Sequence, residues 1–120
     1  MLESNRRKTP RINYPCQLTM WVAQGVYDTV LAQTTNIGMG GLCVHLNQGI
    51  APGMKVDIQI GFPDMTGTFK CKGAVVRCQQ ESQKIYNIGI QFEPLSELNH
   101  IFLDKKISEL INLEKKSEQP

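Results

Sequence analysis

The feature that most constrains the fold is an alternation of apolar and polar residues that recurs along the chain and ends near residue 93. It is clearest in residues 54–60 and 86–92, where every second side chain is a large apolar one. Alternation with a period of two gives a segment one apolar face, which is typical of a half-buried β-strand. The sequence therefore predicts a strand-rich domain over most of its length.

Four further segments carry strand signals. Residues 12–22 alternate, but Pro15 cannot donate to a ladder, so we expect an edge or a bulge there. A short apolar run at 30–32 precedes the sequence Asn36-Ile37-Gly38-Met39-Gly40-Gly41, which we interpret as a turn, and the next strand follows at 42–46. Residues 69–78 form another predicted strand in which Gly73 suggests a bulge or bend, and polar residues 79–84 are expected to form a loop.

The period changes after Pro94. Ser96 is placed to cap a helix. Apolar residues then recur at steps of one, three and four: Leu95, Leu98, Phe102, Leu103, Ile107, Leu110 and Leu113. Six strands with one closing helix predict an all-β fold, a small six-stranded antiparallel barrel whose open end the helix plugs. We expect a flexible basic N-terminal arm at 1–11, the barrel and helix at 12–113, and a disordered tail at 114–120.

Composition limits the class of protein. A chain of 120 residues fits one domain, and no stretch approaches the roughly 18 consecutive apolar residues of a membrane helix. No secretory signal is present, so we expect a cytoplasmic protein with reduced thiols. The four cysteines form no CxxC pair, which predicts no metal site and places Cys16, Cys43, Cys71 and Cys78 in strands.

No catalytic motif is visible. The chain lacks GxSxG, HExxH and GxxxxGK[ST], and neither His45 nor His100 has a nucleophile partner at the sequence level. We expect His45 to be an outward-facing strand residue and His100 to lie at the solvent margin of the helix. The sequence therefore favours a protein that binds rather than an enzyme.

Two short elements suggest what is bound. Arg7 and Arg11 are separated by three residues just before the first strand, and a guanidinium binds phosphate bidentately, reads a guanine edge or stacks on a base. The segment from Asn36 to Gly41 begins with an amide that reads a purine edge, and its glycines allow a ligand close to the backbone. Either element alone is common in sequences without such a function.

In this order, ahead of a strand-rich chain that ends in a helix, the two elements resemble the PilZ domain, the bacterial receptor module for the second messenger cyclic di-GMP. The resemblance runs from about Arg6 to Leu113 and includes residues 52–56, 73–77 and 88–92. It implies a six-stranded barrel with a C-terminal helix and a ligand held between the arm and the turn.

The family pattern is RxxxR followed by [DN]xSxxG. Arg7, Arg11, Asn36 and Gly41 match it, whereas Gly38 stands where the family has serine. Loss of one neutral hydrogen bond costs about 0.5 to 1.5 kcal/mol, which weakens binding rather than abolishing it. Arg6 is a further candidate, which either stacks on a guanine or is merely solvated, and Arg77 is a weaker candidate for the same site.

The resemblance implies a non-enzymatic cyclic di-GMP receptor in bacterial second messenger signalling, such as the control of motility or biofilm formation. We expect its arm to change conformation on binding and to signal to an unidentified protein partner. We expect no cofactor, membrane span or double-stranded nucleic acid, and a monomer or dimer. Two alternatives stay open: a PilZ-like adaptor with weak or no nucleotide binding because of Gly38, and a small barrel that binds single-stranded nucleic acid.

Overall fold

The elements follow the order that the sequence pattern predicts, with one short strand added. The computed structural model describes residues 11–12, 16–22, 28–62 and 68–118. Its elements are β1 (Arg11–Ile12), β2 (Gln17–Val22), β3 (Asp28–Gly38), β4 (Gly41–Leu46), β5 (Lys55–Gly61), β6 (Thr68–Ser82), β7 (Ile85–Phe92) and α1 (Glu97–Glu118).

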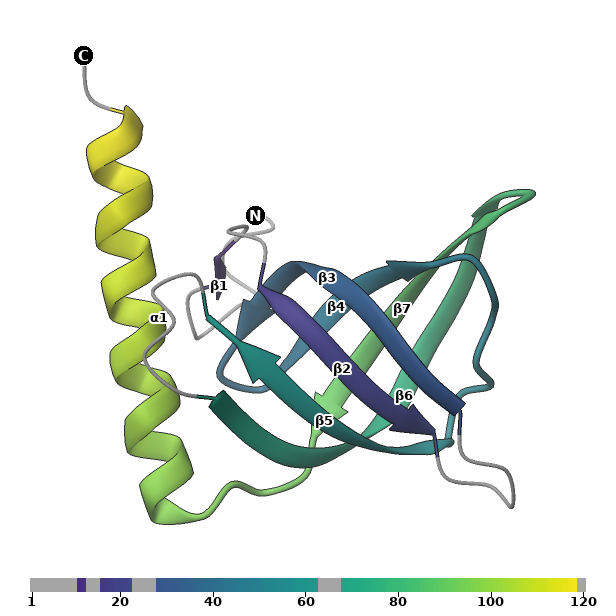
Figure 1. Ribbon diagram of the computed structural model, residues 1–120, viewed down its shortest axis with the longest axis horizontal. Helices are drawn as coiled ribbons and strands as arrows, with labels where there is room; N and C mark the ends of the chain where they lie inside the picture. The colour runs from purple at the N-terminus through teal and green to yellow at the C-terminus, as the bar shows by residue number, and fades with distance from the viewer. Residues whose placement is uncertain (1–10, 13–15, 23–27, 63–67, 119–120) are drawn as a thin grey trace, which may run out of the picture.

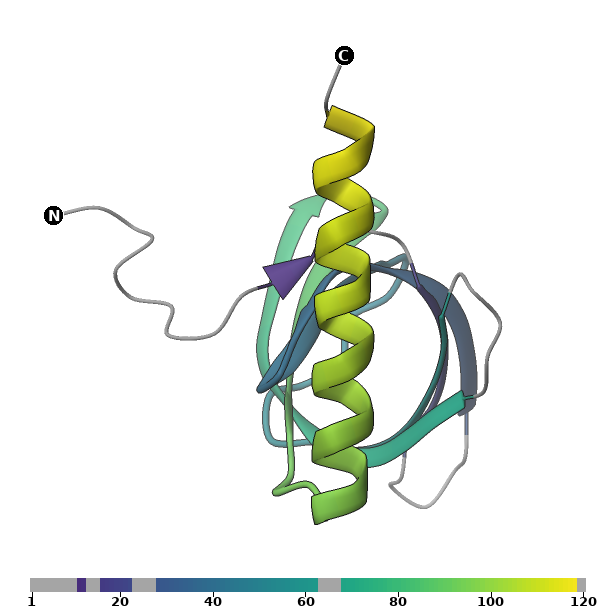
Figure 2. The same cartoon turned by 90° about the vertical axis from the view of Figure 1, so that its left-hand side faces the viewer.

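The strands close into a barrel. The sheet order is β1-β3-β2-β5-β6-β7-β4, every pairing is antiparallel, and an additional β3–β4 pairing joins the two ends. Six strands therefore form the closed barrel, while β1 adds only two residues beside β3. This confirms the predicted six-stranded antiparallel barrel with one C-terminal helix, which lies across one end of the ring of strands (Figures 1 and 2).

The barrel interior is filled by the alternating apolar residues. In β4 and β5 the predicted inward residues are buried, and the residues between them are not: Leu42, Val44, Leu46, Val56, Ile58 and Ile60. Helix α1 adds Leu103, Ile107 and Leu110 to the same core. Phe102 of α1 contacts Phe62 and Phe69 with ring centroids 6.0 and 6.3 Å apart, so aromatic packing joins the helix to the barrel.

Ser96 caps the helix as predicted. Its Oγ accepts a hydrogen bond from the Asn99 backbone N–H at 3.2 Å, and its carbonyl accepts one from His100 at 2.8 Å. The helix continues to Glu118, so the expectation of a disordered tail is wrong for residues 114–118. Lys and Glu are good helix formers, and each added residue extends a helix that is already nucleated.

Several predicted strand boundaries need correction. The strand expected at 12–22 is split into β1 and β2, and residues 13–15, which include Pro15, lie outside the described ranges. The loop expected at 79–84 is a hairpin in which β6 runs to Ser82 and β7 starts at Ile85. A ladder is held by backbone groups, so this exposed hairpin needs no apolar alternation.

The turn and the bulge were also misplaced by the sequence pattern. Asn36, Ile37 and Gly38 belong to β3 and Gly41 begins β4, so the turn contains only Met39 and Gly40. The irregularities in β6 lie between Val75 and Arg77 and between Gln80 and Ser82, not at Gly73. A Cβ at Gly73 would lie 2.8 Å from the Gln91 carbonyl oxygen, so this glycine permits close strand approach instead.

Candidate functional site

The N-terminal basic segment reaches the barrel through β1. Arg11 pairs with Gly38 and Ile12 with Ile37, so the backbone of Arg11 lies beside the last residue of β3. Arg6 and Arg7 lie outside the described residues. Of the arm expected at 1–11, the structure describes Arg11, which is a strand residue paired with Gly38 of the Asn36–Gly41 segment.

A bulge sets the direction of Asn36. Thr34 pairs with Val44, is buried, and accepts a hydrogen bond on its hydroxyl from the Cys16 backbone N–H at 3.0 Å. The register then shifts between Thr34 and Asn36, and Asn36 pairs with Cys43. Since Leu42 and Val44 on either side of Cys43 point into the core, Cys43 and Asn36 share the outer face of the barrel.

The side-chain oxygen of Asn36 is a candidate acceptor for a ligand. Its side-chain Oδ1 is buried, yet it has no hydrogen-bond partner within the part of the chain that is described. Buried polar atoms without partners are rare because the lost hydration costs free energy. The oxygen could accept a hydrogen bond from a donor on a ligand.

The glycines of this hairpin have different roles. Gly38 is an extended strand residue opposite Arg11, so its position does not require the left-handed backbone that only glycine adopts easily. Gly41 pairs with Gln91, and a Cβ added to it would overlap the Ile90 carbonyl oxygen. The close packing of β4 on β7 thus requires glycine at position 41, whereas the backbone angles of Gly38 do not require glycine.

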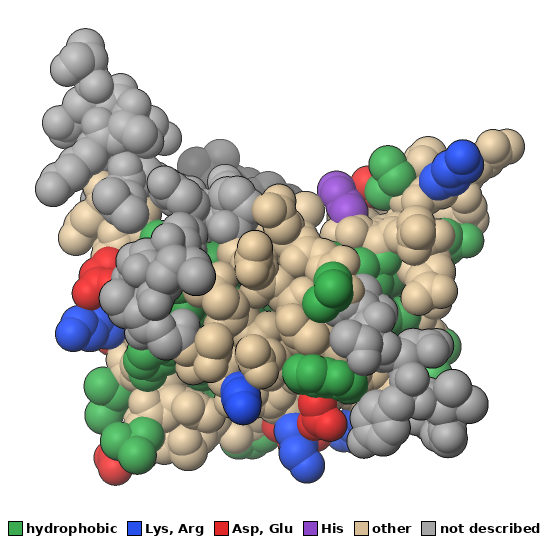
Figure 3. All heavy atoms as spheres, in the orientation of Figure 1, with side chains coloured by type: hydrophobic (Ala, Val, Ile, Leu, Met, Phe, Trp, Pro, Cys, Tyr) green, Lys and Arg blue, Asp and Glu red, His purple; other side chains and the backbone are tan. Residues whose placement is uncertain are grey.

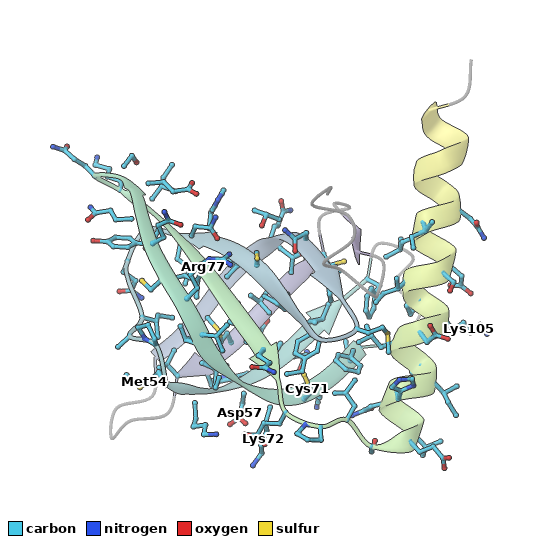
Figure 4. The ribbon with its side chains drawn as sticks, turned by 180° about the vertical axis from the view of Figure 1, so that it is seen from behind. Met54, Asp57, Cys71, Lys72, Arg77 and Lys105 are labelled. Atoms are coloured by element: carbon cyan, nitrogen blue, oxygen red, sulfur yellow. The ribbon has the colours of Figure 1, made fainter. Side chains whose placement is uncertain are left out.

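Arg77 lies on the same face, two strands away from β4 (Figure 4). Cys43 pairs with Gly89, and Gly89 pairs with Arg77, so one row crosses β3, β4, β7 and β6 from Asn36 to Arg77. The Arg77 Nη2 donates to Cys43 Sγ at 3.2 Å and to Asn87 Oδ1 at 3.1 Å. The bulge after Val75 turns Arg77 outward.

A polar chain continues from Arg77 toward the tip of the β6–β7 hairpin. Asn87 donates through Nδ2 to Glu81 Oε2 at 2.9 Å, and Glu81 Oε1 lies 3.3 Å from His45 Nε2. His45 is exposed on the outer face of β4, as predicted, and His100 is exposed on α1. The side chains of His45 and Glu81 are both exposed, so this is a surface contact. Figure 3 shows Lys, Arg, Asp and Glu side chains scattered over the face it displays.

The cysteines do not form a reactive or metal-binding cluster in the described ranges. None of the four is in a disulfide, each lies in a strand or beside one, and no group of three His, Cys, Asp or Glu residues there could hold a metal ion: Cys16, Cys43, Cys71 and Cys78. Burial, with a smaller contribution from nearby Glu93, raises the pKa of the Cys71 thiol to about 12. Cys71 is therefore a packing residue and a poor nucleophile.

A shallow groove lies elsewhere on the barrel. It has a volume of about 350 Å³ and is lined by residues of β2, β5 and β6: Trp21, Asp57, Ile58, Gln59, Lys70, Cys71 and Lys72. Trp21 is half-buried and stands opposite Asp57 in the β2–β5 ladder.

No helix among the described residues is long and apolar enough to cross a membrane.

The structure brings together most of the residues singled out from the sequence. Asn36, Gly38, Gly41 and Arg77 lie on β3, β4 and β6, with the backbone of Arg11 alongside. Sequence reasoning missed the contacts of Arg77 with Cys43, Gly89 and Asn87. A signal was present for one of them, because Gly89 stands at an outward position of an alternating strand where a polar side chain is usual.

The sequence matches the PilZ domain family over residues 5–110. Comparison with the curated proteins finds no match. Among solved structures, the fold is similar to that of the PilZ domain of Escherichia coli YcgR with c-di-GMP, at 16% identity and a TM-score of 0.73, covering 95% of this chain and 99% of that one.

Two longer proteins contain the same fold. Bacillus subtilis MotI/DgrA, an inhibitor of motility, is 15% identical with a TM-score of 0.73, covering 95% of this chain and 54% of that one. The K. pneumonia MrkH–c-di-GMP complex is 15% identical with a TM-score of 0.77, covering 94% and 56%. This chain thus spans about half the length of each. The family match covers every strand of the barrel and most of the helix, and the protein belongs to the PilZ domain family, a family of receptor modules for cyclic di-GMP.

Proposed function

We propose that this protein is a cytoplasmic, non-enzymatic receptor for cyclic di-GMP, which binds between the N-terminal arginines and the outer face of the β3–β4 hairpin. The observation that carries the proposal is the pairing of Arg11 with Gly38. It connects the RxxxR segment directly to the second motif, although the two are far apart in the sequence. A ligand with two phosphates and two guanines offers both kinds of group that this face is equipped to bind.

Each residue has a separate role in this proposal. Arg7 and Arg11 bind phosphate through charge-assisted hydrogen bonds, which are stronger than neutral ones. The unpaired Oδ1 of Asn36 accepts a hydrogen bond from an N–H group on a guanine edge. Gly38 and Gly41 have no side chains, so the ligand can approach the backbone beside Asn36. Arg6 stacks on an exposed guanine when the ligand binds as a stacked pair.

Gly38 makes the site weaker than one with the family serine, because the missing hydroxyl removes a single neutral hydrogen bond. That loss corresponds to roughly a factor of 2 to 13 in affinity. The arginines supply the larger, charge-assisted part of the binding free energy. The adaptor alternative, in which nucleotide binding is lost, is therefore disfavoured.

The single-stranded nucleic acid alternative has less support on this surface. Binding of that kind uses a positive groove with aromatic side chains on which bases stack. Trp21 is half-buried, and its neighbour across the β2–β5 ladder is the acidic residue Asp57. The groove that Trp21 lines also holds Lys70 and Lys72, so its charge is mixed, and Trp21 is its one aromatic side chain among the described residues.

Signalling follows from ordering of the arm. We propose that nucleotide binding changes the conformation of residues before β1 and so creates a surface for a protein partner, with the protein acting as a monomer or a dimer. B. subtilis MotI/DgrA is described as an inhibitor of motility, and a role in motility or biofilm control is proposed for this chain on that likeness.

Isothermal titration calorimetry tests the proposal. Cyclic di-GMP, cyclic di-AMP and a single-stranded oligonucleotide are titrated into the parent protein at one salt concentration. Saturable binding of cyclic di-GMP alone supports the receptor function. Binding of the oligonucleotide but not of cyclic di-GMP would favour the nucleic acid alternative, and no binding of any of the three would favour the adaptor.

A further inference from the structure

The guanidinium of Arg77 is held in a defined place on the outer face of the barrel. Its Nη2 donates to Cys43 Sγ on β4 and to Asn87 Oδ1 on β7, at 3.2 and 3.1 Å. An exposed arginine normally samples many rotamers, and each fixed side chain of this length has an entropic cost. Two acceptors from two strands offset that cost and fix the group before any ligand arrives.

Gly89 allows the guanidinium to lie flat over β7. A Cβ added to Gly89 would lie 3.2 Å from the Arg77 Cζ and 3.3 Å from both Nη1 and Nη2. A point in the plane of the group, beyond these two nitrogens, would be nearer to them than to Cζ. The missing Cβ therefore lies under the face of the guanidinium, and the opposite face points away from the sheet.

The hydrogen bonds leave this open face as the available part of Arg77. Bidentate recognition of a base or a phosphate uses two neighbouring N–H groups along one edge, and each such edge of the guanidinium includes Nη2. Both acceptors already use Nη2, and Arg77 makes no other hydrogen bond in the described ranges. A planar cation with a free face stacks on an aromatic ring.

We propose that Arg77 is a stacking platform for one base of the bound nucleotide, with Gly89, Asn87 and Cys43 as the positioning residues that hold its plane parallel to the sheet. This inference rests on the proposed function and adds a role for a residue outside both motifs. Arg77 stands in the same cross-strand row as Asn36. A base between them would hydrogen-bond through its edge to Asn36 and stack with its face on Arg77.

Three variants separate the plane of Arg77 from its charge. Arg77→Ala removes both, Arg77→Lys keeps the charge and loses the plane, and Gly89→Ala keeps arginine but places a methyl group where the guanidinium rests. Gly61→Ala is the matched control, because among the described residues a Cβ there meets only Gln17 Cβ at 3.8 Å. Thermal melts establish that each variant is folded before its titration with cyclic di-GMP.

Stacking predicts that all three variants bind cyclic di-GMP about fivefold to tenfold more weakly than the parent, with Arg77→Lys close to Arg77→Ala. Gly61→Ala should bind like the parent. If the parent binds and Arg77→Lys and Gly89→Ala bind equally well, the platform is wrong while the receptor function stands. If the parent itself does not bind, both are wrong.

Discussion

Arg11 lies directly opposite Gly38 across the β1–β3 ladder. The last arginine of the RxxxR segment is thereby held beside the residue that replaces the family serine. A two-residue strand is too short to be stable alone, so its position is fixed by β3 and by the core around Ile37. The barrel therefore fixes the position of Arg11 in the candidate site.

Replacing Arg11 with alanine should weaken cyclic di-GMP binding by more than about 1.5 kcal/mol, the scale of a charge-assisted hydrogen bond. Arg7→Ala should behave in the same way. Lys72→Ala serves as the control, since it removes one positive charge from an exposed position on β6, beside the groove that Trp21 lines. Calorimetry gives the three affinities, and equal losses in all of them would indicate a general charge effect instead of a site.

Gly38→Ser should tighten binding modestly, by a factor of about 2 to 13, because it restores one hydrogen-bonding hydroxyl. The backbone of Gly38 opposite Arg11 is extended, so a serine there is not forced into the left-handed region. Titration and a thermal melt are measured on the same preparation. Weaker binding at an unchanged melting temperature would mean that the hairpin has been remodelled around glycine.

Gly41→Ala should destabilise the fold, since its Cβ would overlap the Ile90 carbonyl oxygen and force β4 away from β7. Overpacking of this kind costs about 1 to 3 kcal/mol or more. The neighbouring Gly40→Ala is the control, because no atom of the described residues lies within 4 Å of a Cβ there. Denaturant unfolding measures both free energies, and equal stability of the two variants would contradict the close approach of the strands.

Alkaline pH should reduce stability partly through Cys71. Its pKa is raised from the ordinary 9.0 to about 12 in the folded protein, by burial first and by Glu93 second. The unfolded chain therefore loses this proton at lower pH than the folded one, and the contribution of the neutral thiol is lost as pH rises from about 9 toward 12. Melting temperatures between pH 8 and 11 should fall less steeply for Cys71→Ala than for the parent. Parallel curves would show that Cys71 is not the cause.

The arm should become protected from hydrogen exchange when the nucleotide binds. Arg6, Arg7, Lys8 and Arg11 carry four like charges in six positions, which repel one another until an anion lies between them. Exchange of amides 2–9 should be fast in the free protein and slower in the complex. The amide of Ile58, a buried residue of β5, provides an internal reference. Protection at 2–9 that does not change with nucleotide would place signalling in another element, such as α1.

Strand and helix types were predictable because each rests on a local period. Val56, Ile58 and Ile60 alternate as a barrel strand requires, and Ser96 begins the helix that its hydroxyl caps. Boundaries were harder to predict where strands are polar. Asn36 and Gly38 favour turns by their own preferences, yet pairing with Cys43 and Arg11 keeps them in β3.

Sequence reasoning could name candidate site residues, those of the two motifs together with Arg6 and Arg77, but could not predict their contacts. Register between distant strands decides which side chains meet, and no local pattern specifies it. The contact of Arg77 with Cys43 depends on a bulge at Val76 and on two ladders that pass through Gly89. A polar residue in place of Gly89 would have kept the same alternation and would have excluded the guanidinium.

The most direct test of the receptor function compares the parent with an Arg7→Ala/Arg11→Ala double variant in calorimetric titrations with cyclic di-GMP. Both proteins are first shown to have the same melting temperature, so that a loss of binding cannot come from a loss of folding. We predict saturable binding by the parent and at least a tenfold loss in the double variant. Equal affinity of the two proteins, or no binding by the parent at millimolar nucleotide, would contradict the assignment of this face as a cyclic di-GMP site.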